Sequence, residues 1–463
     1  MKLFFLALAC SAQSLVIEHV TVIDATGAAP RPGMSVGIEK GQITEIKKSI
    51  RPPKGARIVD GTGKFLIPGL WDMHVHIGAP EIFFPLLIAN GITGVREMFT
   101  GIPIETIREW RMRPEVPRIF AAGFIDGPLM LNNGQPPPGA FAVSNAEQAR
   151  LAVQVLAQTG VDFLKVYNSV PRDAYFAIAE EARAIGIPFA GHVPEAVSTG
   201  EASDAGQRSE EHLINVLLDC STNADALRAE RVATMFSDKI TGEARLRALA
   251  WPDPEGLFDT YSPEKAAALF AKFVKNGTWH TPTLVVLSGF VRARDDDFAH
   301  DPRRRFLPRQ WTDTWDPRVT FYLRDLSPED YDKLHARLVA LLDRYKKLVG
   351  DMRKAGVEFL AGTDSSGWNP VLPGFGLHEE LALLVESGLT PMEALQSATR
   401  NPARYFNKLD ELGTVEVKKA ADLVLLNADP LDDIRNTQKI EAIIMRGRYY
   451  SRKDLDAMLK PMQ

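Results

Sequence analysis

The sequence Gly69-Leu70-Trp71-Asp72-Met73-His74-Val75-His76-Ile77-Gly78 decides the fold that we expect for this chain. Successive side chains of a strand point to opposite faces, so Asp72, His74 and His76 share one face. At the carboxyl end of a strand in a parallel barrel, that face opens into the site where such barrels keep their chemistry. Two imidazoles there can chelate a divalent metal, although the triplet alone fits two ordinary strand histidines equally well.

Length and composition indicate an ordinary globular protein. The chain has 463 residues, of which 45% are hydrophobic and 24% charged, enough for a barrel of about 250 residues and a smaller domain. The 54 basic and 59 acidic residues give a net charge of −5 without a dense basic run, so nucleic acid is not an expected partner. No transmembrane span is expected, and the sequence leaves a homo-oligomer open.

The amino terminus has the pattern of an export signal. Lys2 precedes a short apolar run at residues 3–9, followed by small residues, which predicts a signal peptide over residues 1–14 and export to the periplasm or the cell exterior. Ala7-Leu8-Ala9-Cys10 also resembles the box at which bacterial lipoproteins are cleaved, so Cys10 is a candidate for lipid anchoring. The alternative is the apolar amino terminus of a cytoplasmic protein. Cys220 then stands alone, and no disulfide framework is expected.

Both chain ends carry short β segments. Residues 15–66 contain apolar stretches separated by Gly, Pro and Lys turns, and residues 410–463 contain three more at 414–417, 421–426 and 442–449. Neither end has enough residues to bury a core alone. We therefore expect residues 15–66 and 410–463 to form one composite β-sandwich domain.

Residues 67–409 alternate strand and helix, which predicts an α/β fold, a parallel (β/α)₈ TIM barrel. After the strand that carries His74, further strands are expected at 92–98, 118–123, 162–167, 187–193, 208–213, 279–286 and 357–364. The span from His212 to Asp364 is much longer than two βα units need, so we expect a helical insertion at about 216–350. Attached at the carboxyl face of the strands, it would be either a lid or substrate wall, or a solvated outgrowth.

Polar residues end several of the expected strands: Lys165 the fourth, His192 the fifth, His212 the sixth and Asp364 the eighth. Taken singly, each has an ordinary explanation as a surface lysine, a core histidine or a helix cap. Together they would place unpaired charge inside the barrel, and a bound metal removes that cost for all of them at once. The set predicts a metal site.

These residues and their neighbours resemble the amidohydrolase superfamily. The matching motifs are His74-Val75-His76 after Pro-Gly-Leu-Trp-Asp, Lys165 in Phe-Leu-Lys-Val-Tyr, His192 in Ala-Gly-His, His212 in Glu-Glu-His and Asp364 in Ala-Gly-Thr-Asp. The similarity runs from about residue 16 to residue 450. It is greatest to the imidazolonepropionase-like and prolidase-like branch, in which Thr281-Pro282-Thr283-Leu284 and the sequences of residues 377–381 and 398–403 also recur.

The resemblance implies a metal centre and roles for its residues. Two divalent metals, expected to be Zn²⁺, would be bridged by a carbamate formed from carbon dioxide on Lys165. His74, His76 and Asp364 would hold the deeper metal, and His192 and His212 the outer one. Asp364 would also move the proton.

Two further residues are candidates beyond the ligands. His280 could polarise the substrate carbonyl or the oxyanion, as a catalytic and substrate-binding residue, and Tyr167 shares the face of Lys165 and could contact substrate. Either could instead be core packing.

We therefore expect a metal-dependent hydrolase that cleaves a carbon–nitrogen bond, amide, peptide or lactam-like, in a small-molecule amide or a dipeptide-like substrate. One alternative is a mononuclear zinc hydrolase of the imidazolonepropionase type, with Lys165 unmodified. The other is a catalytically silent binding scaffold. Prolidase-like relatives carry a tyrosine after the fifth-strand histidine that meets the substrate carboxylate, and this chain has Val193-Pro194 there. The resemblance thus stops short of a carboxy-terminal proline dipeptide.

Overall fold

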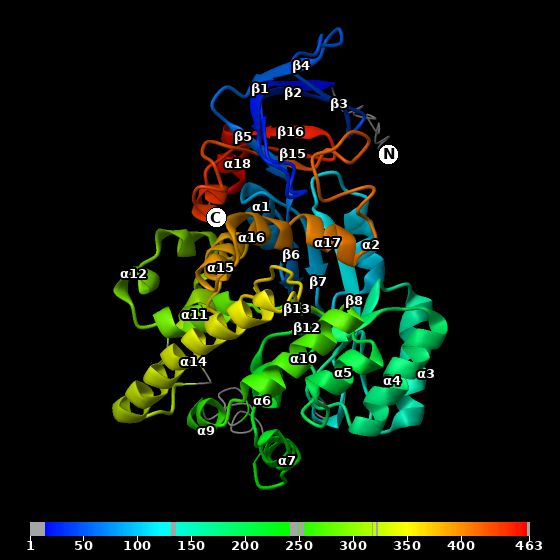
Figure 1. Cartoon of the computed structure of the whole chain (residues 1–463), viewed down its shortest axis with the longest axis vertical. Helices are drawn as coiled ribbons and strands as arrows, with labels where there is room; N and C mark the ends of the chain where they lie inside the picture. The colour runs from blue at the N-terminus through cyan, green and yellow to red at the C-terminus, as the bar shows by residue number, and fades with distance from the viewer. Residues whose placement is uncertain are drawn as a thin grey trace, which may run out of the picture.

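The structure is a computed structural model that describes residues 14–130, 136–240, 249, 254–316, 318–320 and 323–460. The chain ends meet in a sheet at one pole of the molecule, and the barrel with its helices makes up the rest (Figure 1). The α/β TIM-barrel fold with a composite β domain is confirmed. The predicted signal peptide, including Cys10, lies outside the described residues apart from Ser14.

One eight-stranded sheet joins the two chain ends. It consists of β1 (Leu15–Val22), β2 (Arg31–Glu39), β3 (Gln42–Lys47), β4 (Arg57–Asp60), β5 (Phe65–Pro68), β14 (Leu423–Leu426), β15 (Ile440–Met445) and β16 (Arg448–Ser451). Its order is β16-β15-β14-β5-β1-β2-β3, with β4 beside β1. The antiparallel pairing of β14 with β5 joins the two ends, and their apolar side chains, among them Ile17, Leu66 and Leu425, share one core.

One strand expected near the carboxyl end is absent. Residues 414–417 run through a turn instead, because Lys418 has a φ of 77° and Val415 donates its N–H to the Asp24 carbonyl.

Seven parallel strands form the barrel wall, in the order β6-β7-β8-β10-β11-β12-β13. They are β6 (Leu70–Val75), β7 (Ile92–Glu97), β8 (Arg118–Asp126), β10 (Phe163–Val166), β11 (Phe189–Gly191), β12 (Ser209–Glu211) and β13 (Trp279–Thr281), with β9 (Ala140–Ala142) added beside β8. The expected eighth strand at 357–364 makes single parallel bridges, His280 to Phe359 and Val75 to Ser365. The barrel therefore closes, although its last member is irregular.

Helices cover the outside of the barrel. They are α1 (Pro80–Ala89), α2 (Ile104–Arg111), α3 (Ala146–Thr159), α4 (Arg172–Ile185), α5 (Thr199–Ala205), α10 (Pro263–Asn276), α15 (Phe375–Glu386), α16 (Pro391–Ser397) and α17 (Arg400–Tyr405), with α18 (Arg452–Met458) near the carboxyl terminus. Local sequence sets their limits: in α3, the Asn145 side chain accepts the Gln148 N–H and Gly160 ends the helix at a φ of 77°. Their buried faces form the large cores around the strands.

The expected insertion at 216–350 is not one continuous block, because the barrel elements α10 and β13 lie within it. The additional helices are α6 (Ile214–Asp219), α7 (Ala224–Met235), α9 (Pro254–Asp259), α11 (Leu284–Arg292), α12 (Asp296–Ala299), α13 (Arg309–Thr312) and α14 (Pro328–Lys354). Single 3₁₀ turns lie at Pro128–Met130, Pro302–Phe306, Asp313–Trp315 and Ile434–Gln438. β13 ends at Thr281 rather than at residue 286, because Pro282 and the left-handed Thr283 start α11.

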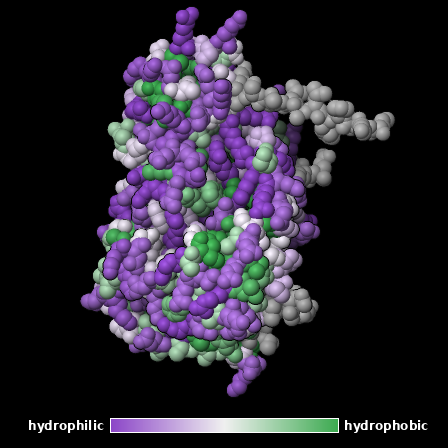
Figure 2. Space-filling model, turned by 90° about the vertical axis from the view of Figure 1, so that its right-hand side faces the viewer, coloured by the Kyte–Doolittle hydropathy of each residue, from purple (hydrophilic) through white to green (hydrophobic). Residues whose placement is uncertain are grey.

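The surface is mixed in character. On the face shown in Figure 2, hydrophilic side chains predominate and hydrophobic ones form smaller patches between them. Among the described residues, no helix combines the length and the apolar character that a membrane crossing needs.

Candidate metal centre

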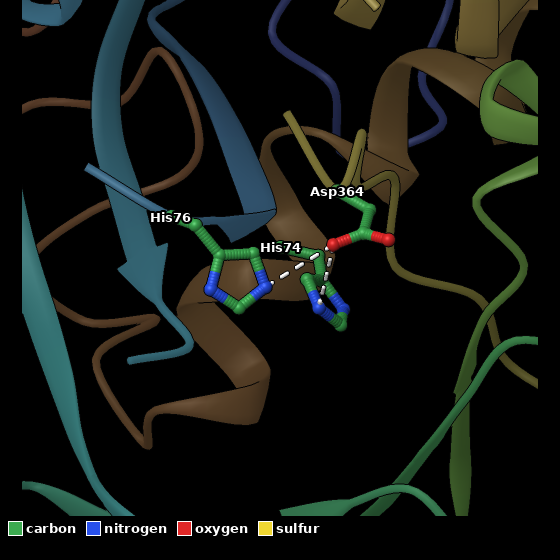
Figure 3. Close-up of side chains that lie close together, drawn as sticks. All are labelled: His74, His76 and Asp364. Carbon is green, nitrogen blue, oxygen red and sulfur yellow. Dashed lines mark ion pairs between the residues drawn. The ribbon is translucent and has the colours of Figure 1, made fainter. Parts of the chain in front are cut away.

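Asp364 lies between the two histidines of the His-X-His motif. Its Oδ1 is 3.4 Å from Nε2 of His74 and 3.1 Å from Nε2 of His76, and the two rings turn towards it (Figure 3). His74 comes from the end of β6 and is fully buried, and Asp364 comes from the irregular eighth segment. One ligand atom from each residue lies within 4.8 Å of the others, a spacing that suits a shared cation.

A second pair of histidines lies beside this triad. His192 follows β11 and His212 follows β12, and their Nε2 atoms are 3.1 Å apart. The ring of His212 is 5.1 Å from that of His74, centroid to centroid. Lys165, on β10, is buried and lines the same cavity as His76, His192 and Asp364. The structure thus brings together all six side chains that the sequence predicts as ligands.

The far nitrogen of each imidazole is held by the protein. Nδ1 of His74 contacts Glu211 Oε2 at 2.9 Å, and Nδ1 of His76 contacts the Phe99 carbonyl at 2.6 Å. Nδ1 of His192 contacts Asn168 Oδ1, and Nδ1 of His212 contacts Thr283 Oγ1, both at 2.6 Å. A carboxylate and a carbonyl only accept, so Nδ1 of His74 and His76 carries the proton and Nε2 keeps its lone pair for a metal.

Burial favours the neutral form of three of the histidines. It lowers the pKa of His212 and holds the pKa values of His74 and His192 well below the ordinary range. Burial would raise the pKa of Asp364, but His74, His76 and His212 outweigh it and hold that pKa well below the usual value. Neutral imidazole and carboxylate are the protonation states that bind divalent metals.

Lys165 is the cation among these ligands. Burial lowers the pKa of its amine to about 8, so at pH 8 about half of the amine is unprotonated. An unprotonated amine is the form that can react with carbon dioxide.

Four residues of the site adopt the left-handed backbone region, which side chains other than glycine rarely do: Phe99 (φ 98°), His212 (65°), Thr283 (50°) and Asp364 (53°). In each case the turn at the end of a barrel strand places a ligand, or a group that holds one. Strained backbone of this kind is concentrated at functional sites.

The structure shows functional residues that sequence reasoning did not assign. Glu211 holds His74 and, through both oxygens at 2.7 Å, the buried guanidinium of Arg96. Asn168 and Thr283 hold outer histidines, and Asn369 donates Nδ2 to Asp364 Oδ2 at 3.0 Å. A signal existed for two of them: Glu211 directly precedes His212, and Thr283 belongs to the Thr-Pro-Thr-Leu motif.

His280 was expected near the substrate, and the structure corrects this. Its ring lies 4.4 Å from that of Phe273 on α10, centroid to centroid, in the layer between strand and helix. Its neighbour Thr281 instead contacts Arg96 inside the barrel. Successive strand residues point to opposite faces, so His280 points away from the metal ligands. Tyr167 does line the cavity, and its ring is 4.2 Å from that of His192; its role stays a prediction.

The side chains fit a divalent metal. Nε2 of His74 is buried and has no hydrogen-bond partner among the described residues, which is costly for a polar atom. It points at the Asp364 oxygen from too far for a hydrogen bond. A cation between them would satisfy both atoms.

Comparisons with known proteins agree with this arrangement. Residues 343–449 match the Amidohydrolase family. An imidazolonepropionase of Maricaulis maris is 37% identical over 91 residues, 19% of this chain and 22% of that protein. The curated relatives thus align over about a fifth of their own length.

Solved structures share the fold over nearly the whole chain. A Xaa-Pro dipeptidase with bound methionine has a TM-score of 0.64 and 20% identity over 95% of this chain and 100% of its own. Bottromycin amidohydrolase has a TM-score of 0.68 and 22% identity, over 96% of this chain and 88% of its own. The chain is thus similar to the Amidohydrolase family at residues 343–449 and shares its fold with these solved structures over nearly its whole length.

Proposed function

We propose that the protein is a metal-dependent hydrolase that cleaves the carbon–nitrogen bond of an amide, peptide or lactam-like substrate with water. The observation that carries this proposal is the convergence of His74 and His76 on Asp364, with each Nδ1 already held so that each Nε2 faces inward. The match of residues 343–449 to the Amidohydrolase family and the hydrolases among the similar proteins support the same reaction class.

We also propose that the site binds two zinc ions. His74, His76 and Asp364 would hold one, and His192 and His212 the other, with a carbamate on Lys165 between them. The two outer Nε2 atoms lie 3.1 Å apart, close enough for one cation to bind both. The lowered pKa of Lys165 supplies the unprotonated amine that a carbamate requires. A divalent ion in this position supplies Lewis-acid activation of water and of the substrate carbonyl.

Asp364 is suited to proton transfer. Its Oδ1 faces the histidines, and Asn369 holds its Oδ2, so one oxygen stays directed into the site. As the water oxygen bonds to the carbonyl carbon, Oδ1 accepts the water proton; it returns the proton to the nitrogen as the carbon–nitrogen bond breaks. Tyr167 and Phe124 line the cavity and exclude water from one side.

Asp364→Asn tests the proposal. The variant should keep its fold and much of its metal but lose about 10²- to 10⁴-fold in turnover, the usual share of proton transfer. Turnover is measured with the zinc-loaded wild type and variant on a panel of aryl amides, dipeptides, N-acyl amino acids and lactams. Wild-type protein that hydrolyses nothing on this panel, or an Asn variant with full turnover, would contradict the proposal and favour a binding scaffold.

A mononuclear zinc site is the second candidate. The set His74, His76 and Asp364 favours it, since among the described residues it is the one group of three or more His, Cys, Asp or Glu side chains whose ligand atoms all lie within 4.8 Å of one another. It predicts that Lys165→Ala retains near-normal turnover with one zinc.

A further inference from the structure

The substrate cavity extends well beyond the metal ligands. It has a volume of about 710 Å³ and reaches from His76 and Lys165 to helices α7, α11 and α14. This volume is in the range of pockets that take drug-sized ligands. The residues of the predicted insertion thus form one wall of the substrate cavity.

Aromatic rings line the cavity next to the ligands. Phe99 stacks on Phe124 with ring centroids 4.6 Å apart, and Phe124 lies 5.5 Å from Tyr167, whose ring contacts His192. This row of rings begins at the residue whose carbonyl holds His76 and ends at an outer histidine. A flat apolar group beside the scissile bond would lie against it.

Helices α11 and α14 add an aliphatic and aromatic part to the cavity lining. α11 contributes Leu287 and Phe290, and α14 contributes Leu341 and Tyr345, which share one face at a spacing of four residues. These side chains are buried in the fold yet border the cavity. An apolar ligand group placed there removes apolar surface from water on both sides.

One ion pair also lines the cavity. Arg231 on α7 donates Nε and Nη2 to the two carboxylate oxygens of Glu195, both at 2.7 Å, and Nη2 also reaches the Leu249 carbonyl. The two side chains are 12% and 4% exposed. Among the described lining residues, Lys165 and Arg231 are the lysine and the arginine. Lys165 belongs to the candidate metal centre, and the charge of Arg231 is neutralised by Glu195. Its Nη1 makes no hydrogen bond to a described residue.

We propose that the site takes an uncharged amide with a bulky apolar group. The apolar group lies between the aromatic row and the α11–α14 wall, and a neutral carbonyl at the far end accepts a hydrogen bond from Arg231 Nη1. Because the Glu195–Arg231 pair has no net charge, it offers a free carboxylate no attraction to offset desolvation. This inference rests on the proposed function, because it assumes that the bound amide is hydrolysed. The preferred substrate class is tested separately, by binding.

Three ligands test it with the zinc-loaded protein: naphthoyl-phenylalaninamide, its free acid and acetyl-glycinamide. We expect the neutral amide to bind at least about tenfold more tightly than the acid, and acetyl-glycinamide at least about a hundredfold more weakly than the neutral amide. Calorimetric Kd values and kcat/KM are both measured, so that binding decides the substrate class even if turnover is absent. Tighter binding of the acid, or of the small amide, would overturn the proposal.

Glu195→Gln gives a sharper readout, because it leaves the charge of Arg231 uncompensated. The acid should then gain at least about tenfold in affinity relative to the amide. Glu195→Gln combined with Arg231→Gln restores a neutral pair and should return the preference to the amide. Glu180→Gln, which breaks an exposed ion pair with Arg150, is the matched control and should leave the ratio unchanged. An acid-to-amide ratio that is the same in all four proteins would contradict the role of the pair.

Two further variants test whether the α11–α14 side chains contact the apolar group of the ligand. Phe290→Ala should raise KM and Kd for the naphthoyl amide while leaving those for acetyl-glycinamide nearly unchanged. Val339→Ala, on an exposed face of α14, is the control. Equal losses for both ligands would show a structural role for Phe290 rather than contact with substrate.

Discussion

At the scale of single residues, the site depends on the groups that hold the histidines. Nε2 of an imidazole points to a metal only if Nδ1 is fixed, and here a carboxylate, a carbonyl, an amide and a hydroxyl fix it. Such partners set both the tautomer and the ring orientation. The sequence identifies the histidines but not these partners, all four of which come from other strands or loops.

Thr283 tests this point, because its hydroxyl holds the outer ligand His212. Thr283→Val removes the hydroxyl at constant shape and should weaken binding of the outer metal by about 10- to 100-fold. Thr283→Ser keeps the hydroxyl and should retain wild-type affinity. Competition with a chromogenic chelator measures both variants. Equal metal affinity in the Val and Ser variants would show that the hydroxyl does not orient His212.

The sequence predicts some residues of the candidate site but not others. Lys165, His192, His212 and Asp364 could be predicted because each ends an apolar strand, where a barrel places its chemistry. His280 could not, because a shift of one residue in strand register sends a side chain to the opposite face. The sequence does not show whether His280 or Thr281 points inward; the contact of Thr281 with Arg96 does.

At the scale of elements, helix α11 links the candidate metal centre to the cavity lining. It begins directly after Thr283, and the buried Glu380 of α15 accepts the Val285 N–H at 2.8 Å at its first turn. α14 packs along α11. The sequence predicts the insertion from its length, but it left a wall and a solvated outgrowth equally open, since only packing decides between them.

Glu380 makes stability depend on pH. Burial raises its pKa from 4.5 to about 8. Between these values the unfolded chain releases the proton while the folded protein keeps it, so stability falls as pH rises from about 4.5 to 8. Glu380→Gln cannot ionise and loses this pH dependence, which is worth roughly 1.4 kcal/mol for each tenfold difference in proton affinity between the folded and unfolded chain. Urea unfolding of both proteins at pH 5 and pH 8 measures this pH dependence. The prediction is contradicted if variant and wild type differ in unfolding free energy by the same amount at both pH values.

At the scale of the whole molecule, the sheet built from both chain ends is fixed to the barrel. Asp422 accepts Arg118 Nε and the Arg446 N–H, both at 2.7 Å, and its carbonyl accepts the Gly69 N–H at the start of β6. The sequence predicts that the chain ends pair, because neither can bury a core alone. It does not predict which residues fix the sheet to the barrel.

Asp422→Ala should therefore destabilise both parts together. It leaves a buried N–H and a half-buried guanidinium without their partner, a loss of about 1–3 kcal/mol. We expect one cooperative thermal transition at a lower midpoint, with metal content unchanged. Calorimetry checks this, and two separate transitions would show that the sheet and the barrel unfold independently.

We propose above all that the strand-end side chains form a two-metal centre around Lys165. The most direct measurement is the zinc content of wild-type protein and Lys165→Ala after zinc loading and gel filtration, by elemental analysis. We predict about two zinc ions per chain in the wild type and one or fewer in the variant, because the bridging anion that offsets two dications is lost. Equal zinc content in both proteins, or no retained zinc in the wild type, would contradict the two-metal centre.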